Sequence, residues 1–296
     1  VGVQVLSPAP KYWRKPFFFS LFLECVLNKM IIFLISVLLL ILFFIYNYIQ
    51  ISKFHISKPI FYSLKLKEDI RITQITDYHS NSFIDKDKLL REIQQFNPHM
   101  IVLTGDILDK RISHIDSALD LARRLCDINP NVFFVIGNHE LQNAQGQRFI
   151  SEITKMGVKF LDNQYEILEM DQQRINIVGL SFFADEKDYE KVKKYVDWNN
   201  YTVVLSHSPN RLVSLVSGQE DLVLSGHIHG GQVRLPIIGA IIGPGQGLFP
   251  KYDKGVFEIK DTILYIDSGL GNSSLPIRLF NRVQMSNITI KPESSK

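Results

Sequence analysis

Short apolar runs alternate with amphipathic stretches from about Glu68 to the end of the chain. Apolar, β-branched runs predict buried strands, whereas apolar residues spaced three and four positions apart predict helices. The predicted strands are IRITQITD (70–77), MIVLTGD (100–106), NVFFVIGNHE (131–140, running into a loop), INIVGLSFF (175–183), YTVVLSHSP (201–209) and DLVLSGHIH (221–229). The predicted helices are 85–96, 115–128 and 186–196, and residues 256–269 look like a hairpin. Strands that alternate with helices indicate an α/β domain with much parallel sheet.

A different pattern occupies the beginning of the chain, where residues 30–46 read MIIFLISVLLLILFFIY without a charge. Together with 47–51 this run reaches the ~20 residues that a membrane-spanning helix needs. A cleaved signal peptide would have a shorter apolar region and a small-residue cleavage site, which IYNYIQISK does not offer. We therefore expect an uncleaved transmembrane anchor. Basic residues on both sides of it leave its orientation open.

These patterns divide the chain into a poorly defined N-terminal extension (1–29), a transmembrane anchor (30–51), a linker (52–67) and a folded domain (68–292). The chain begins with Val, and Met30 is its first Met. We hypothesise that the natural start is Val26 or Leu27, read as Met from an alternative start codon.

The charge and the cysteine content limit the kinds of partner and cross-link that we expect. The 33 basic and 30 acidic residues give a net charge of +3, which is too small an excess of positive charge to indicate nucleic-acid binding. Cys25 and Cys126 lie in different regions, so a disulfide framework is not expected. We predict no nucleic-acid partner, and nothing points to a protein partner.

Ligand-type residues follow five of the predicted strands, and in open α/β sheets ligand sites gather at the carboxyl ends of strands. Imidazole and carboxylate groups suit Mn, Fe, Zn, Co or Ni, and the absence of cysteine ligands argues against a structural zinc. Seven positions would supply two such ions: Asp77, His79, Asp106, Asn138, His207, His227 and His229. A carboxylate that bridges two ions, with an activated water between them, is the chemistry of phosphate-ester hydrolysis. We expect two divalent ions as cofactors, with Mn favoured.

The same blocks resemble a known family. TDYH (76–79), GDILD (105–109), GNHE (137–140), SHSP (206–209) and GHIHGGQ (226–232) occur in the order typical of calcineurin-like metallophosphoesterases. The stretches GGQVRLPIIGAIIGPGQGLFPKYDKG and SGLGNSSLPIRLFNRVQ further resemble the membrane or cell-surface YkuE-like branch. The resemblance covers about residues 68–290 and implies a four-layer α/β/β/α sandwich. Tyr78 stands where Leu is common, which we interpret as a packing variation.

The resemblance also implies roles for individual residues. One ion would take Asp77, His79, Asp106 and His229, and the other would take Asp106, Asn138, His207 and His227, with Asp106 bridging. His139, oriented by Asp109, would stabilise or protonate the leaving oxygen. Asp109 could instead be the turn or capping carboxylate of its own loop.

We therefore predict a single-pass membrane protein with a binuclear phosphoesterase domain that hydrolyses phosphate mono- or diesters through a metal-bridged hydroxide. The substrate could be an amphiphilic or cell-envelope phosphoester. Alternatives are a UDP-2,3-diacylglucosamine pyrophosphate hydrolase-like activity, or a non-catalytic scaffold of the same fold; a nuclease is disfavoured by the charge balance. The resemblance favours the extracytoplasmic side for the domain, and the residues themselves leave the side open.

The apolar, glycine-rich loop 237–252 allows two interpretations. It could be a packed surface loop, or a lip that receives an amphiphilic substrate or touches the bilayer. Arg234, just before it, could contact substrate or be a structural charge.

Overall fold

The computed structural model describes residues 15–170, 172–272 and 276–293 of the chain. The first fourteen residues of the predicted extension lie outside this range. The chain divides into two compact units, 1–48 and 49–296, which are described separately below.

Helix α1 (Lys15–Ser52) is long and apolar. Its segment Phe19–Ser52 is long and apolar enough to cross a membrane, judged by length and composition. Large apolar side chains between positions 19 and 45 are exposed around the helix, which is the pattern of a span rather than of an amphipathic surface helix. The helix is thus a candidate membrane span, and it begins well before the predicted anchor at residue 30.

The first of two large sheets carries the N-terminal half of the predicted strands. Its strand order is β1-β17-β3-β4-β5-β6, with β2 also paired to β17. Strands β3 to β6 run parallel, and β17 pairs antiparallel with β3. The strands are β1 (His55–Ser57), β2 (Ile60–Ser63), β3 (Ile70–Ile75), β4 (Met100–Leu103), β5 (Val132–Phe134), β6 (Lys159–Phe160) and β17 (Gln284–Pro292).

The second sheet has the order β15-β16-β10-β9-β8-β7. Its centre, from β8 to β16, is parallel, and antiparallel hairpins close both edges. The strands are β7 (Gln164–Met170), β8 (Gln173–Gly179), β9 (Tyr201–Leu205), β10 (Leu222–Ser225), β15 (Gly255–Ile259) and β16 (Thr262–Ile266). The hairpin predicted over 256–269 is confirmed as β15–β16.

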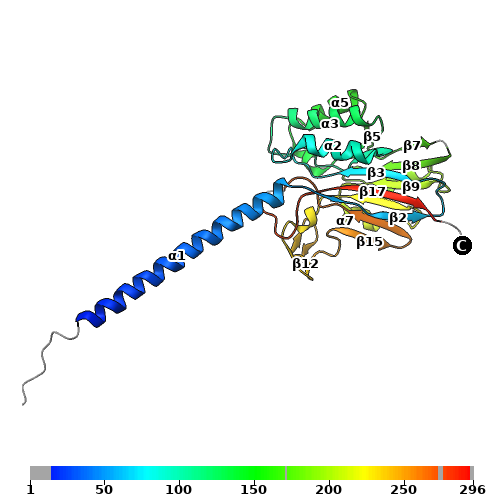
Figure 1. The fold of residues 1–296 in the computed structure, drawn as a ribbon. Coiled ribbons are helices and arrows are strands. Elements are labelled where there is room, and N and C mark those ends of the chain that lie inside the picture. The colour runs from blue at the N-terminus through cyan, green and yellow to red at the C-terminus, as the bar shows by residue number, and fades with distance from the viewer. Residues whose placement is uncertain (1–14, 171, 273–275, 294–296) are drawn as a thin grey trace, which may run out of the picture. The chain divides into compact units, whose positions relative to one another are not determined.

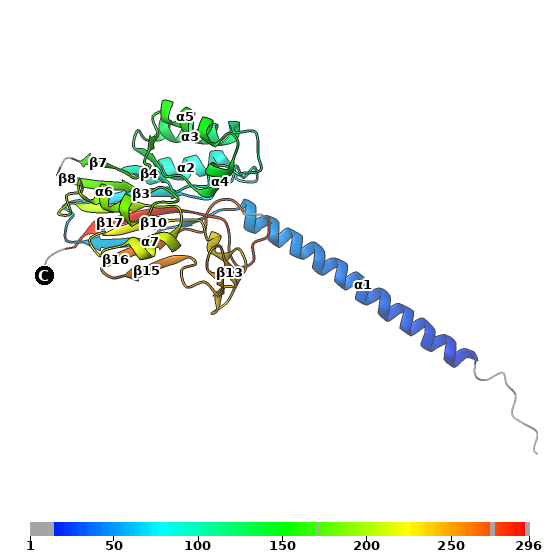
Figure 2. The same ribbon diagram turned by 180° about the vertical axis from the view of Figure 1, so that it is seen from behind.

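Helices cover the outer faces of the two stacked sheets. In Figures 1 and 2, α2, α3 and α5 lie over the first sheet, and α6 and α7 lie against the second. The helices of this unit are α2 (Lys86–Phe96), α3 (Asp116–Ile128), α4 (Asn138–Gln142), α5 (Gly146–Lys155), α6 (Glu186–Lys193) and α7 (Pro209–Leu215). The predicted four-layer α/β/β/α sandwich is confirmed.

Each interface between layers has its own apolar core. Ile72 and Val102 of the first sheet pack with Val203 and Leu224 of the second in the central core. A second core joins the first sheet to α2, α3 and α5, and a third joins the second sheet to α6 and α7. Because the central strands are buried on both faces, they are apolar at successive positions, and this made them recognisable in the sequence.

Several elements were not recognised from the sequence. Strands β1 and β2 lie within the segment 52–67, for which the sequence predicts a linker, and both pair with β17. These strands are three and four residues long, which is too short for a period to be visible. Helices α5 and α7 and strand β17 were also not predicted. The loop 237–252 contains most of two small hairpins, β11 (Arg234–Leu235) with β12 (Gly239–Ala240), and β13 (Ile242–Gly243) with β14 (Gly247–Leu248).

Candidate metal centre

The ligand-type residues follow the carboxyl ends of parallel strands, as the sequence predicts. Asp77 and Asp106 follow β3 and β4 of the first sheet, and Asn138 begins the helix after β5. His207 and His227 follow β9 and β10 of the second sheet. Because the sheets stack with these ends on the same side, the fold brings together residues that are far apart in the chain, such as Asp77 and His229.

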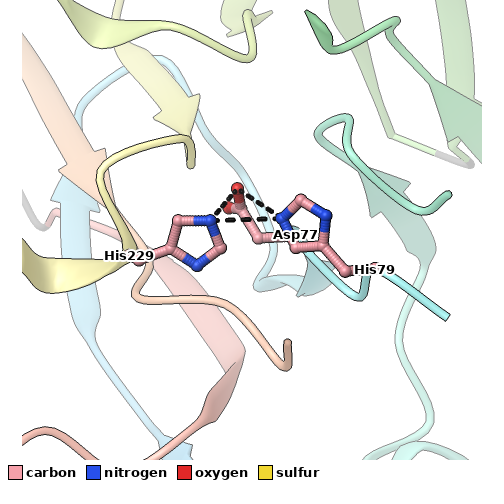
Figure 3. A group of neighbouring side chains, drawn as sticks. All are labelled: Asp77, His79 and His229. Atoms are coloured by element: carbon pink, nitrogen blue, oxygen red, sulfur yellow. Dashed lines mark hydrogen bonds and ion pairs between the residues drawn. The ribbon is translucent and has the colours of Figure 1, made fainter. Parts of the chain in front are cut away.

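One group consists of Asp77, His79 and His229 (Figure 3). His229 Nε2 lies 3.4 Å from Asp77 Oδ1, and His79 Nε2 lies 3.9 Å from the same oxygen. The two Nε2 atoms are 3.2 Å apart. Figure 3 shows both rings directing a nitrogen towards the Asp77 carboxylate. All three side chains are buried, so these donor atoms are shielded from bulk water.

A second group consists of Asp106, His207 and His227. His207 Nε2 is 3.1 Å from Asp106 Oδ2 and 3.1 Å from His227 Nδ1. Asp106 Oδ2 also lies 3.9 Å from His79 Nε2, which belongs to the first group. The Asp106 carboxylate, a member of the second group, therefore also lies close to the first.

The backbone at these positions is unusual. Left-handed φ values are rare for residues other than glycine and cluster at functional sites, although Asp, Asn and His tolerate them best. Five of the predicted ligands adopt them: Asp77 (φ 48°), His79 (48°), Asp106 (53°), His227 (71°) and His229 (51°). The packing around these turns holds the backbone in this conformation, and this aims successive side chains into one space.

The glycines of the GD, GN and GH pairs are needed for close approach. A Cβ atom on Gly137 would lie 2.2 Å from Asp106 Oδ1, and one on Gly226 would lie 2.3 Å from Asp77 Oδ2. Any other residue would push a ligand carboxylate out of place. The spacing of the motifs thus reflects packing of backbone against the acidic side chains.

Glu140 braces the loops that carry the ligands. Its buried carboxylate accepts hydrogen bonds from the backbone N–H groups of Asp106, Leu108 and Gly137, each at 2.9 Å. Burial, with the nearby Asp106 charge, raises the pKa of Glu140 to about 7. This carboxylate ties the loop after β4 to the start of α4, so the second and third motifs move as one piece.

The electrostatics of the metal-free site prepare most imidazoles as ligands. Burial lowers the pKa of His79 and of His227 to about 3, and it lowers that of His229 well below its ordinary value. These rings are neutral at pH 7, which is the form that binds a metal ion.

Two groups in the site hold protons that an ion would displace. Although burial opposes it, the Asp106 carboxylate raises the pKa of His207 to about 10. Burial raises the pKa of Asp77 to about 7. Metal ligands bind in their deprotonated forms, so ion binding would release protons here.

The donor set fits divalent cations. Asn138 Oδ1 is buried and has no hydrogen-bond partner among the described residues. Buried polar atoms rarely lack a partner unless an ion or water completes them. Carboxylates and imidazoles, the groups brought together here, are ligand types that Mn, Fe and Zn share.

His139 lies beside the site, but Asp109 does not hold it by a hydrogen bond. The distance between His139 Nδ1 and Asp109 Oδ1 is 4.0 Å. The Lys110 backbone N–H donates to His139 Nδ1 instead, at 3.2 Å. The Asp109 carboxylate accepts from the backbone N–H and guanidinium of Arg111. His139 Nε2, 4.0 Å from Asp106 Oδ2, remains directed at the ligands.

Two residues that were not predicted hold His229. Arg278 is fully buried; it donates to the carbonyls of Ser268 and Gly271 at 2.6 Å and lies 3.3 Å from His229 Nδ1. Asn281 Nδ2 donates to the His229 carbonyl at 2.6 Å. Both residues lie in the stretch SGLGNSSLPIRLFNRVQ that carries the resemblance to the YkuE-like branch, but from the sequence a buried role for Arg278 could not be told from a surface charge.

Arg234 has a structural partner. Its guanidinium donates to Asp253 Oδ2 at 2.8 Å and to the Gly230 carbonyl at 3.1 Å. Of the two interpretations left open by the sequence, these contacts support the structural one.

The fold and this cluster of acids and imidazoles are those of a metal-dependent phosphoester hydrolase. Residues 70–231, more than half of the chain, match the family described as calcineurin-like phosphoesterase, and the chain belongs to that family. It is thus an enzyme that hydrolyses phosphoesters with metal ions.

Particular relatives place the chain within the family. An uncharacterized metallophosphoesterase of Bacillus subtilis, YkuE, is 28% identical over 76% of this chain and 80% of its own length. One from Aquifex aeolicus is 29% identical over 75% of this chain and 85% of its own. A Danio rerio protein named a transmembrane protein with metallophosphoesterase domain is 25% identical over 75% of this chain and 53% of its own. The predicted resemblance to the YkuE-like branch is confirmed at this level.

Proposed function

We propose that this protein is a membrane-anchored phosphoesterase whose site holds two divalent metal ions, with Mn favoured. The observation that carries the proposal is the presence of two neighbouring groups of candidate ligands, the second of which includes Asp106, whose Oδ2 lies 3.9 Å from His79 Nε2 of the first. Two ions in such a site lower the pKa of water and offset charge on phosphate oxygens. The substrates are phosphate mono- or diesters.

We further propose how the ligands divide. The first ion takes Asp77, His79 and His229, the second takes Asn138, His207 and His227, and Asp106 serves both. Support comes from the distances within each group, from the unpaired Asn138 Oδ1, and from the neutral state of three imidazoles.

His139 acts on the substrate in this proposal. Because Nδ1 accepts the Lys110 N–H, the proton of the neutral ring sits on Nε2, the atom that faces the ligands. Burial lowers the pKa of His139, which favours this neutral form at pH 7. Nε2–H donates a hydrogen bond to a phosphate or leaving-group oxygen as negative charge develops there.

Membrane anchoring is part of the same proposal. It is supported by the candidate span Phe19–Ser52 and by the transmembrane name of the Danio rerio relative. Protein that stays with the membrane fraction after alkaline carbonate washing would agree with an anchor, and release into the wash would contradict it.

The test is hydrolysis by the full chain in lipid nanodiscs. Turnover of p-nitrophenyl phosphate and bis-p-nitrophenyl phosphate is measured with added Mn²⁺ and with chelator, beside Asp106→Asn. The matched control is Asp120→Asn, the same change on α3, where Asp120 pairs with Lys86 and Arg123 outside the site. Metal per chain is measured for each protein by elemental analysis.

We expect two ions per wild-type chain and turnover that chelator abolishes. Asp106→Asn should lose at least one ion and fall by roughly 10³-fold or more in kcat, since the charge that offsets both ions is removed. Asp120→Asn should behave as wild type. A single ion per active chain, or an Asp106→Asn variant with wild-type turnover, would contradict the binuclear proposal.

A further inference from the structure

A pocket of about 350 Å³ opens beside the metal centre, and no step proposed above uses it. Three apolar residues and four glycines make up most of its walls: Ile228, Ile242, Pro244, Gly231, Gly243, Gly245 and Gly247. Gln232 and His229 complete the lining. The size lies within the range of small-molecule sites. Because glycine contributes only backbone, these walls leave room for a ligand.

The pocket adjoins the ligand cluster at one shared residue. His229, a member of the first metal group, also lines the pocket. A phosphate at the metal centre and a group seated in the pocket are therefore neighbours and can be two ends of one molecule.

The chemistry of the walls selects the occupant. Apart from His229, no ionisable side chain and no aromatic ring is among the lining residues that the structure describes. A nucleoside would call for stacking rings, and a sugar would call for several hydrogen-bonding side chains, whereas Gln232 is the single uncharged polar side chain among the described lining residues. Hydrocarbon gains free energy by leaving water for such walls.

Hydrogen bonds hold the loop that lines the pocket. Asn210 Nδ2 donates to the Pro244 carbonyl at 2.9 Å, which fixes this loop to the start of α7. Gln246 bonds the backbone of Tyr252 in both directions, at 2.7 and 3.0 Å. These contacts close the loop without filling it.

The surroundings of the pocket are apolar as well. Ile237, Leu248 and Phe249 are exposed on the two hairpins. Ile237 is fully exposed at the turn of the first hairpin with φ 72°, a conformation that is strained for a β-branched residue. An apolar side chain in this exposed position is available for contact with apolar groups outside the domain.

We propose that this pocket binds the hydrocarbon chain of an amphiphilic phosphoester while its phosphate lies at the metal centre, and that the substrate comes from the bilayer. The inference rests on the proposed function and names the substrate class of the same site. The candidate span ends at Ser52, and Ile51 accepts a hydrogen bond from Asn81, two residues after His79. Chain connectivity alone thus keeps the domain close to a bilayer.

The test uses alkylphosphonates, which mimic phosphate monoesters and are not hydrolysed. Affinities of methyl-, butyl- and octylphosphonate for the Mn²⁺-loaded full chain in nanodiscs are measured by calorimetry, with empty nanodiscs subtracted to remove partitioning. Ile242→Asn places an amide in the pocket wall. Ile238→Asn is the matched control, because Ile238 is equally exposed (60% against 57%) on the same loop but does not line the pocket.

We expect octylphosphonate to bind at least ~100-fold more tightly than methylphosphonate, since each buried methylene contributes about threefold or more. Ile242→Asn should reduce this ratio at least ~10-fold, and Ile238→Asn should preserve it. Methylphosphonate affinity in each variant checks that the metal centre is folded.

The two proposals fail in different ways. If methylphosphonate binds and the longer chains add nothing, or if Ile242→Asn and Ile238→Asn keep the same ratio, the pocket does not take the chain and this inference is overturned. If methylphosphonate does not bind the metal-loaded chain at all, the proposed function fails and this inference fails with it. Adenosine 5′-monophosphate that binds more tightly than octylphosphonate would also overturn the proposed substrate class.

Discussion

A single backbone N–H decides the chemistry open to His139. With Nδ1 accepting from Lys110, the ring can donate only through Nε2, and Asp109 is left to Arg111. His139 would thus depend on the loop backbone for its orientation, rather than on a partner carboxylate.

This arrangement separates two variants. We predict that His139→Ala lowers kcat by roughly 10²–10⁴, with two ions retained. Asp109→Asn should lower kcat by less than about tenfold, because Arg111 and not His139 is its partner. Steady-state kinetics and metal analysis of both variants test this. A loss in Asp109→Asn as large as that in His139→Ala would mean that the carboxylate orients the ring during turnover.

Glu220 supplies a pH-dependent contribution to stability. Its buried carboxylate accepts from Tyr189 Oη at 2.6 Å and from the backbone N–H groups of Ser217 and Gly218 at 3.0 Å. Although burial opposes ionisation, these hydrogen bonds lower the pKa of Glu220. A lowered folded-state pKa stabilises the fold above the unfolded pKa of about 4.3, and this contribution is lost as pH falls through the folded value.

We therefore predict that Glu220→Gln lowers the free energy of unfolding by about 2 kcal/mol at pH 7. The difference from wild type should shrink as pH falls below about 4. Denaturant unfolding of both proteins between pH 3 and 7 measures it. A difference that is constant over this range would show that the ionised form has no special role.

At the scale of elements, the ends of α2 show how local sequence sets a boundary. Asp85 caps the start by accepting from the Lys88 N–H at 2.9 Å. Asn97 ends the helix with φ 51°, in the left-handed conformation. After glycine, Asn is among the residues that adopt the left-handed conformation most readily, because its short polar side chain can hydrogen-bond locally.

We predict that Asn97→Ala lowers the free energy of unfolding by about 1 kcal/mol, while Asn97→Gly is neutral or stabilising. Thermal unfolding of the two variants distinguishes backbone conformation from side-chain contacts. Equal losses in both would show that the amide contacts, and not the φ angle, matter at this position.

At the scale of the whole chain, the catalytic unit begins at Ile49, before the first strand. The Gln50 carbonyl accepts from the Val283 N–H at 2.9 Å, and the Ile51 carbonyl accepts from Asn81 Nδ2 at 3.2 Å. Ile51 itself is buried. The last turn of α1 is therefore part of the domain's own hydrogen bonding.

This predicts different outcomes for two truncations. A fragment of residues 49–296 should have the same melting temperature as the domain in the full chain. The free energy of unfolding of 55–296 should be lower by about 2–4 kcal/mol, because two hydrogen bonds and one buried isoleucine are lost. Calorimetry of both fragments gives the comparison. Equal melting temperatures would show that residues 49–54 do not contribute to the stability of the domain.

Much of the fold and of the site could be predicted from the sequence because both depend on patterns within short stretches of the chain. The central strands are apolar at successive positions, and the ligand-type residues directly follow them, so parallel pairing predicts a shared edge. The sequence alone therefore determined the α/β class, the apolar span and the seven candidate ligands.

What the sequence could not decide depends on packing between distant segments. His79 and His229 are 150 positions apart and in contact, and Arg278, which lies in the segment before β17, contacts His229. No local sequence pattern predicts these pairs. Asp109 accepts hydrogen bonds from Arg111, two residues away, whereas His139, thirty positions further along the chain, lies 4.0 Å from it. The pocket beside His229 forms where the β13–β14 hairpin meets the segment that follows β10. Local periodicity and motif spacing determine elements and chemistry, whereas neighbours across layers, and the space left between them, are decided by how side chains pack in three dimensions.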